Sequence, residues 1–260
     1  MAAQQRHFWN LTEAASSRIL VVDEFANDQQ QRTMEAAVWH AWEHIPRPYF
    51  PDHAPAGTDH YAIEREAYRG PAANTSFHKP DVIVVRVRQP APPVAPGQRP
   101  ARAQERDVLW IECKAPSEIA PNGWHTVLVE AQGRLSSAHA NPQTGSRQVY
   151  LILAVGMKWM CFLWNPHAAL AQPLVVRKDN GRDFWTDIDP RIHPIPAATL
   201  PGQRHIVNGV IETNQAYTLN YWDVTAAGQL AHLADLTLLE NLFAVIQAHN
   251  YTDGWNPPHF

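Results

Sequence analysis

Two stretches of the sequence decide the expected fold, His78-Lys79-Pro80-Asp81-Val82-Ile83-Val84-Val85 and Val108-Leu109-Trp110-Ile111-Glu112-Cys113-Lys114. Each has the apolar run of a β-strand. Because successive side chains of a strand point to opposite faces, Glu112 and Lys114 project from one side of the second strand. Two acids and an amine that converge at the edge of a sheet suit a hard divalent cation, which is the arrangement that phosphodiester hydrolysis needs.

Composition indicates a folded chain with a sizeable core and a net charge that does not favour a nucleic-acid partner. The 260 residues include 45% hydrophobic residues and 10 tryptophans, enough for a sizeable core. The net charge of −4 argues against a nucleic-acid partner unless a local basic patch exists. Five arginines between the two stretches either form such a patch or lie scattered in a solvated loop: Arg86, Arg88, Arg99, Arg102 and Arg106.

The sequence favours a location inside the cell, in the cytoplasm or nucleus. Its 2 cysteines, Cys113 and Cys161, lie in apolar runs and indicate core packing in a reducing compartment. The first ten residues lack the apolar segment of a signal peptide. The longest apolar stretch, residues 149–164, is interrupted by Gly156 and Lys158 and is too short to cross a membrane. We therefore expect no membrane partner.

The order of expected elements predicts an α/β fold, an α+β mixed sheet flanked by helices, in a single domain of residues 1–260. Apolar spacing predicts helices over 27–45, 124–140 and 231–250. Strands are expected over 81–88, 107–114, 148–155, 157–164 and 217–224, with one hairpin around Gly156 and another at Asn208-Gly209. Residues 61–68 are an ambiguous edge strand, residues 89–102 a proline-rich connection, and residues 165–204 the best candidate for an insertion.

The residue types of the two stretches define a candidate metal site. Mg²⁺ or Mn²⁺ would be held by Asp81, Glu112 and the backbone carbonyl of Cys113, with waters completing the shell. Lys114 would orient the attacking water or offset charge on phosphorus. The alternative is that Asp81 only ends a turn and that Glu112 and Lys114 form an ordinary surface pair.

A competing motif lies in the first expected helix. Residues 40–44, His-Ala-Trp-Glu-His, fit the H-x-x-E-H pattern of inverted zinc peptidases, with His40 and His44 on one helical face and Glu43 as the base. Pro46 ends that helix within a turn, and no later acidic helix offers a third ligand. A motif match without its context is weak evidence for a zinc site.

The pair Pro80-Asp81 and Glu112-Cys113-Lys114 resembles the motif of the PD-(D/E)xK nucleases, and the chain is similar to uncharacterised nuclease-like proteins of fungi. The resemblance covers about residues 30–165 and implies a restriction-endonuclease-like core, with residues 166–260 as a C-terminal extension. It also implies auxiliary roles for Gln132 and Glu35. Gln132 would contact the water or phosphate, or else cap the polar face of its helix. Glu35 would join the metal shell, or else be a solvated helix residue. Glu130 and Arg134 read as an i, i+4 ion pair.

The resulting expectation is a metal-dependent nuclease that acts on DNA in preference to RNA. The alternative is a nuclease-fold protein that no longer cuts and serves as a nucleic-acid-binding or protein-interaction module. A homodimer is compatible with cutting both strands of a duplex. A toxin-like effector, with a protein partner bound through the C-terminal region, is a third possibility.

Overall fold

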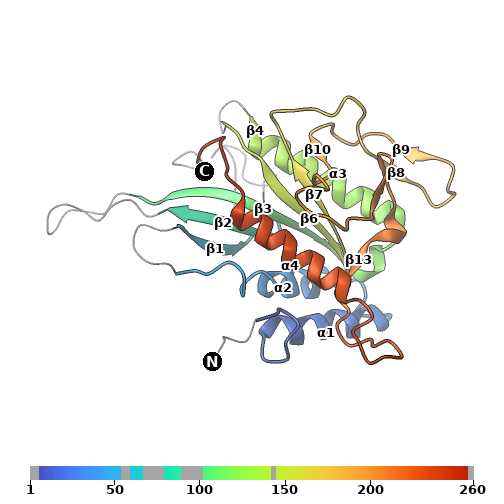
Figure 1. The fold of residues 1–260 in the computed structure, drawn as a ribbon. Helices are drawn as coiled ribbons and strands as arrows, with labels where there is room; N and C mark the ends of the chain where they lie inside the picture. The colour runs from blue at the N-terminus through green and yellow to red at the C-terminus, as the bar shows by residue number, and fades with distance from the viewer. Residues whose placement is uncertain (1–5, 54–58, 67–78, 89–101, 142–144, 257–260) are drawn as a thin grey trace, which may run out of the picture.

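A mixed β-sheet lies between helices on both of its faces in the computed structural model of the chain (Figure 1). The structure describes residues 6–53, 59–66, 79–88, 102–141 and 145–256. The expected mixed α/β architecture is thereby confirmed. His78, Arg99 and most of the proline-rich connection lie outside the described residues.

The main sheet has the strand order β1-β2-β3-β6-β7-β10, and β13 also pairs with β7. Strands β1 (Asp59–Arg65), β2 (Val82–Arg88) and β3 (Gln104–Lys114) form an antiparallel meander with β1 at the edge. Strand β6 (Val149–Val155) runs parallel to β3, and β7 (Lys158–Trp164) returns antiparallel to β6. A parallel neighbour requires a long crossover, which helix α3 (Pro121–His139) supplies.

Each face of the sheet buries its own apolar cluster. On one face the core is closed by α1 (Ala14–Asn27), α2 (Glu35–His44) and α4 (Leu233–Ala248), and α4 crosses the front of the sheet in Figure 1. On the other face α3 packs through Trp124, Val127, Leu128, Ala131 and Leu135. The strands are buried on both faces, which explains why β2 and β6 read as continuous apolar runs rather than as alternating ones.

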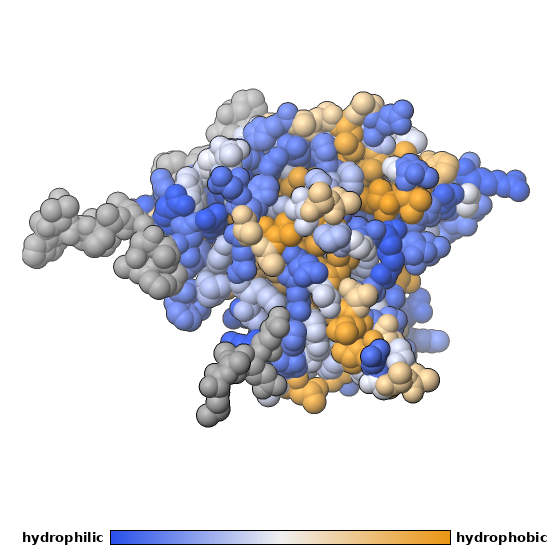
Figure 2. Space-filling view, in the orientation of Figure 1, coloured by the Kyte–Doolittle hydropathy of each residue, from blue (hydrophilic) through white to orange (hydrophobic). Residues whose placement is uncertain are grey.

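Surface hydropathy differs between the two ends of the sheet. In Figure 2 hydrophilic residues cover most of the β1–β2 end, and hydrophobic residues gather toward the opposite end of that face. Among the described residues, no helix is both long enough and apolar enough to span a membrane.

The C-terminal third contributes to the main sheet and also forms a small sheet of its own. Strands β10 (Ile192–His193) and β13 (Tyr217–Thr218) extend the main sheet beside β7. The small sheet has the order β11-β12-β8-β9, formed by β8 (Val175–Arg177), β9 (Phe184–Trp185), β11 (Ile206–Val207) and β12 (Val210–Ile211). A further short pair joins β4 (Ala140–Asn141) and β5 (Gly145–Ser146) after α3.

Two turn predictions are confirmed. Asn208 and Gly209 both have positive φ, +51° and +80°, as the two-residue hairpin between β11 and β12 requires. Gly156, with φ +54°, turns β6 into β7. A Cβ on Gly156 would lie 2.9 Å from the Cα of Pro116, so this glycine also lets the chain after β3 pack against the hairpin.

Two elements differ most from the sequence prediction. The helix expected over 27–45 begins only at Glu35, because residues 28–34 form turns in which Asp28 accepts hydrogen bonds from the backbone N–H groups of Gln30 and Arg32. The strand expected over 217–224 ends at Thr218. Helix α1 was not predicted, and its buried residues Ala15, Ile19 and Val22 follow the helical spacing that would have revealed it.

Three of the arginines that could form a basic patch contact acids of the chain. Arg86 and Arg88 both contact Asp59 across the β1–β2 pair. Arg106 is 2% exposed and contacts Asp253 near the C-terminus. These contacts offset part of the positive charge of the described arginines, although Arg86 and Arg88 share the single carboxylate of Asp59.

A buried polar contact joins β3 to α3 at the end of the sheet where β3 begins. The carboxylate of Asp107 lies 3.0 Å from Nε2 of His139 and accepts hydrogen bonds from Trp110 and Asn256. Val84 pairs with Leu109 but Val85 pairs with Asp107, so Val108 is the extra residue of a β-bulge. The bulge resets the alternation of side chains and turns Asp107 toward α3.

Candidate functional site

The start of β2 and the end of β3 bring the predicted acids together. Val82 pairs with Ile111, which places Asp81 opposite Glu112 at the next position of the antiparallel register. Oδ2 of Asp81 accepts a hydrogen bond of 2.6 Å from the backbone N–H of Cys113. The two motif segments therefore meet as the sequence predicted.

Arg134, from the middle of α3, lies between the two acids. Its Nη1 atom donates a short hydrogen bond to Oε2 of Glu112 and lies 3.9 Å from Oδ1 of Asp81. The Glu112 side chain is 2% exposed, whereas that of Arg134 is 29% exposed. The guanidinium thus covers a buried carboxylate and still reaches solvent.

Lys114, at the end of β3, contacts helices on both faces of the sheet. Its Nζ atom lies 2.9 Å from Oε2 of Glu130 on α3 and 3.5 Å from Oε2 of Glu35 at the start of α2. The start of α2 is held in place because Ser117, in the 3₁₀ helix η1 (Pro116–Glu118), donates its N–H to the carbonyl of Arg32. Glu35 consequently lies beside Lys114 in the cluster, while its expected place in a metal shell stays a prediction.

Burial governs the electrostatics of this cluster. Burial, and then the charge of Asp81, raises the pKa of Glu112 well above its ordinary value. Burial likewise raises the pKa values of Asp81 and Glu35. Burial alone would lower the pKa of Lys114, but the hydrogen bond that it donates to Glu130 and the charge of Glu35 raise it overall. Lys114 is therefore a cation, not a proton acceptor, near neutral pH.

One oxygen of the site has no hydrogen-bond partner. Oε1 of Glu112 is buried and accepts no hydrogen bond from any described residue. A buried carboxylate oxygen left without a donor is costly, and a cation would satisfy it. The carbonyl of Cys113 faces the same side, because the N–H and C=O of one strand residue point in the same direction and its N–H points to Asp81.

The donor set fits a hard divalent cation that keeps waters of its own. Within the described ranges, no group of three or more His, Cys, Asp and Glu side chains is close enough to hold a metal ion. Mg²⁺ needs only one or two carboxylates when waters and substrate oxygens complete its shell. Asp81, Glu112 and the carbonyl of Cys113 would be the ligands.

No family model, curated protein or solved structure matches this chain.

Gln132 lies outside the cluster. Its side-chain amide donates to the carbonyl of Asp187 at 3.0 Å and accepts from the N–H of Asp189 at 2.9 Å. These bonds fasten the segment before β10 to α3. The auxiliary role expected for Gln132 has no contact in the structure that would support it.

Arg134 and Glu130 are the two site residues whose roles the sequence reading missed. They were expected to pair with each other, but Glu130 binds Lys114 and Arg134 binds Glu112 instead. Being one turn apart on α3, they face the end of β3 together. Their position beside the buried stripe of Val127 and Ala131 could have indicated this, because that stripe faces the sheet.

The zinc-peptidase motif does not form a metal cluster. Oε1 of Glu43 lies 2.7 Å from Nη2 of Arg47, and its Oε2 lies 3.6 Å from Nη1 of Arg65. Nδ1 of His40 is 4.0 Å from the same Oε2 atom of Glu43. Two arginines near the presumed base oppose the binding of a cation there. The thiols of Cys113 and Cys161 are both buried, and burial raises both of their pKa values, as expected for core packing.

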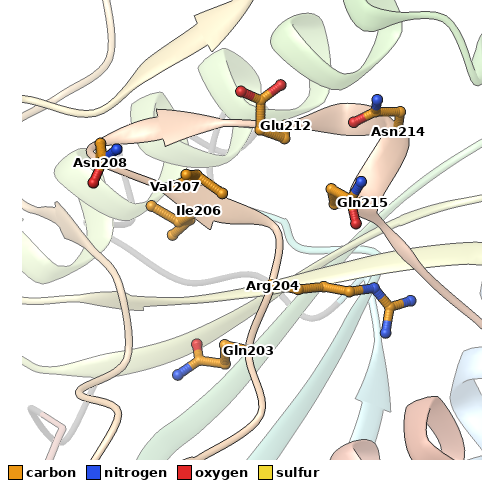
Figure 3. Close-up of a pocket in the computed structure, with 8 residues that line it drawn as sticks. All are labelled: Gln203, Arg204, Ile206, Val207, Asn208, Glu212, Asn214 and Gln215. Atoms are coloured by element: carbon orange, nitrogen blue, oxygen red, sulfur yellow. The ribbon is translucent and has the colours of Figure 1, made fainter.

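A cavity of about 640 Å³ lies in the C-terminal third, and neither Asp81 nor Glu112 is among the residues that line it (Figure 3). Its two charged lining residues are already paired, since Arg204 binds Asp235 and Glu212 accepts from Arg177 at 2.7 Å. The other residues that line it are amides and aliphatic side chains: Gln203, Ile206, Val207, Asn208, Asn214 and Gln215. With no unpaired acid or base in its lining, this cavity offers no comparable chemistry.

Proposed function

We propose that this chain is a metal-dependent nuclease of the PD-(D/E)xK type that hydrolyses phosphodiester bonds, with DNA as the expected substrate. The observation that carries the proposal is the unsatisfied, buried oxygen of Glu112 beside Asp81. The meander of β1, β2 and β3 followed by the crossover to β6 supports it, because that topology joins the two motif segments.

The roles of the residues follow from their surroundings. Asp81, Glu112 and the Cys113 carbonyl would hold Mg²⁺ or Mn²⁺, which supplies Lewis-acid stabilisation of charge on the phosphate. Lys114, kept cationic by Glu130 and Glu35, would orient the attacking water against the phosphorus.

Glu35 would accept the proton of that water. Its carboxylate is partly exposed at the rim, and burial raises its pKa, which makes it a stronger base than an ordinary glutamate. The water oxygen forms the new bond to phosphorus, the bond from phosphorus to the ester oxygen breaks, and solvent protonates the departing oxygen.

Cleavage assays on matched variants test the proposal. The wild type, Asp81→Ala and Lys114→Ala would be incubated with supercoiled plasmid, linear duplex, single-stranded DNA and RNA in Mg²⁺ or Mn²⁺. We expect cleavage to fall by at least about a hundredfold in both variants. Gln132→Ala is the control from the same region, and circular dichroism confirms folding. Undiminished cleavage by Asp81→Ala and Lys114→Ala would refute the mechanism.

A second function, a nuclease-fold module that binds without cutting, is favoured by the position of Arg134. A guanidinium already placed between Asp81 and Glu112 stabilises the acids without a metal. Titration calorimetry with Mn²⁺ separates the two functions. Binding that is lost in Glu112→Ala supports the nuclease, whereas no binding at millimolar metal supports the module.

A further inference from the structure

We propose that Arg134 is an internal competitor of the metal: its guanidinium neutralises Glu112 and Asp81 when the metal is absent and must leave them when the metal binds. The proposal rests on the proposed metal site but concerns the affinity of that site rather than cleavage.

Glu112 and Asp81 need a positive charge close to them. Glu112 and Asp81 are neighbouring acids, and Glu112 is 1% exposed. Two adjacent carboxylates in a poorly solvated place repel each other, so the folded chain needs a cation near them. Arg134 is the basic side chain in contact with Glu112 in the described structure, because Lys114 is bound to Glu130 and Glu35 instead.

The guanidinium of Arg134 satisfies only one oxygen of the Glu112 carboxylate. Arginine can bind a carboxylate through two parallel hydrogen bonds, but here Nη1 reaches only Oε2 of Glu112 and leaves Oε1 without a partner. A cation that binds both Glu112 and Asp81 satisfies more of the available oxygen atoms. The guanidinium is therefore a neutralising group that a divalent ion can replace.

The side chain of Arg134 can move from the acids into solvent. About a third of the Arg134 side chain is already exposed, at 29%, so the guanidinium can move into solvent without crossing the core. Helix α3, packed along its length through the apolar stripe, stays in place during such a rotation. The affinity for the metal therefore depends on how much more favourably the metal binds these oxygens than the guanidinium does.

The experiment measures binding of Mn²⁺ alone by titration calorimetry to the wild-type chain, Arg134→Gln and Arg65→Gln. Arg65 is the matched control, since it lies beside Val82 on the neighbouring strand but its guanidinium packs on Trp39, 4.0 Å from the ring centroid. Both variants remove one positive charge, but only Arg134→Gln removes a group bound to Glu112.

We expect Mn²⁺ to bind Arg134→Gln at least about tenfold more tightly than the wild type, with a much smaller change in Arg65→Gln. Equal or weaker binding by Arg134→Gln, or equal gains in both variants, would overturn the proposal. If Arg134→Gln is too unstable without metal, its melting temperature in a chelator and in Mn²⁺ replaces the titration. A larger Mn²⁺-induced rise than in the wild type supports competition, and an equal or smaller rise contradicts it. Cleavage is not used as a readout, so a chain that never cuts DNA can still confirm or refute this role.

Discussion

Strand β3 places a buried acid against α3 at each of its ends, and the two acids are treated differently. Asp107 contacts His139, Trp110 and Asn256, so both of its oxygens have partners. Glu112 contacts Arg134 through one oxygen and leaves the other without a partner among the described residues. The fully satisfied acid fastens the helix to the sheet. The partly satisfied acid retains the capacity to bind something else.

The largest difference between the two ends should appear in stability. His139→Ala removes one hydrogen-bond partner of the buried Asp107 carboxylate and should lower the free energy of unfolding by about 3 kcal/mol. Glu112→Gln removes a buried charge that is poorly compensated and should change it by less than about 1 kcal/mol. Urea unfolding in a chelator measures both. A similar loss in the two variants would remove the distinction.

Metal should distinguish the two ends next. Mn²⁺ at about a hundred times its dissociation constant should stabilise the wild type by roughly 2.7 kcal/mol. His139→Gln should gain as much as the wild type, whereas Glu112→Gln should gain little. The measurement is the shift of the urea midpoint at constant slope. A gain in Glu112→Gln as large as in the wild type would show that the metal binds at another place.

Gln132 should behave as part of the structural group. Gln132→Ala removes two hydrogen bonds to the segment before β10 and should lower the free energy of unfolding by about 1 kcal/mol. Affinity for Mn²⁺ and cleavage should stay at wild-type levels. Reduced cleavage by a fully folded Gln132→Ala would restore the auxiliary catalytic role that the resemblance implies.

The smallest expected effect is a difference in the sign of the pH dependence. Burial lowers the pKa of His139, so its contribution is lost as pH falls below about 6.5, where the unfolded chain takes up a proton first. Burial raises the pKa of Glu112, so its contribution is present at low pH and is lost as pH rises above about 4.3 toward the folded value.

Single variants expose each dependence in turn. In a chelator between pH 5 and 7, stability should rise more steeply with pH in Glu112→Gln than in the wild type. In His139→Gln, stability should fall with pH relative to the wild type. Urea unfolding at three pH values measures the slopes, and slopes that both variants leave unchanged would show that neither group titrates as its burial requires.

The sequence predicted the strands of the site well because local patterns determine them. Apolar runs placed β2, β3, β6 and β7 almost at their observed bounds, and Gly156 and Asn208-Gly209 marked the turns correctly. The start of the helix before the site was predicted less accurately. The side chain of Asp28 accepts a hydrogen bond in turns that apolar spacing alone would assign to the helix. The bulge at Val108 has no signal in the alternation of β3.

The sequence by itself determined that Asp81, Glu112 and Lys114 lie at the ends of strands, because strand periodicity fixes the direction of each side chain. Only the tertiary structure decided which cations neutralise which acids. Arg134 binds Glu112, Glu130 binds Lys114, and Gln132 turns away from both. These partners come from the rotation of α3 against the sheet, and packing across both layers sets that rotation rather than any spacing within the helix.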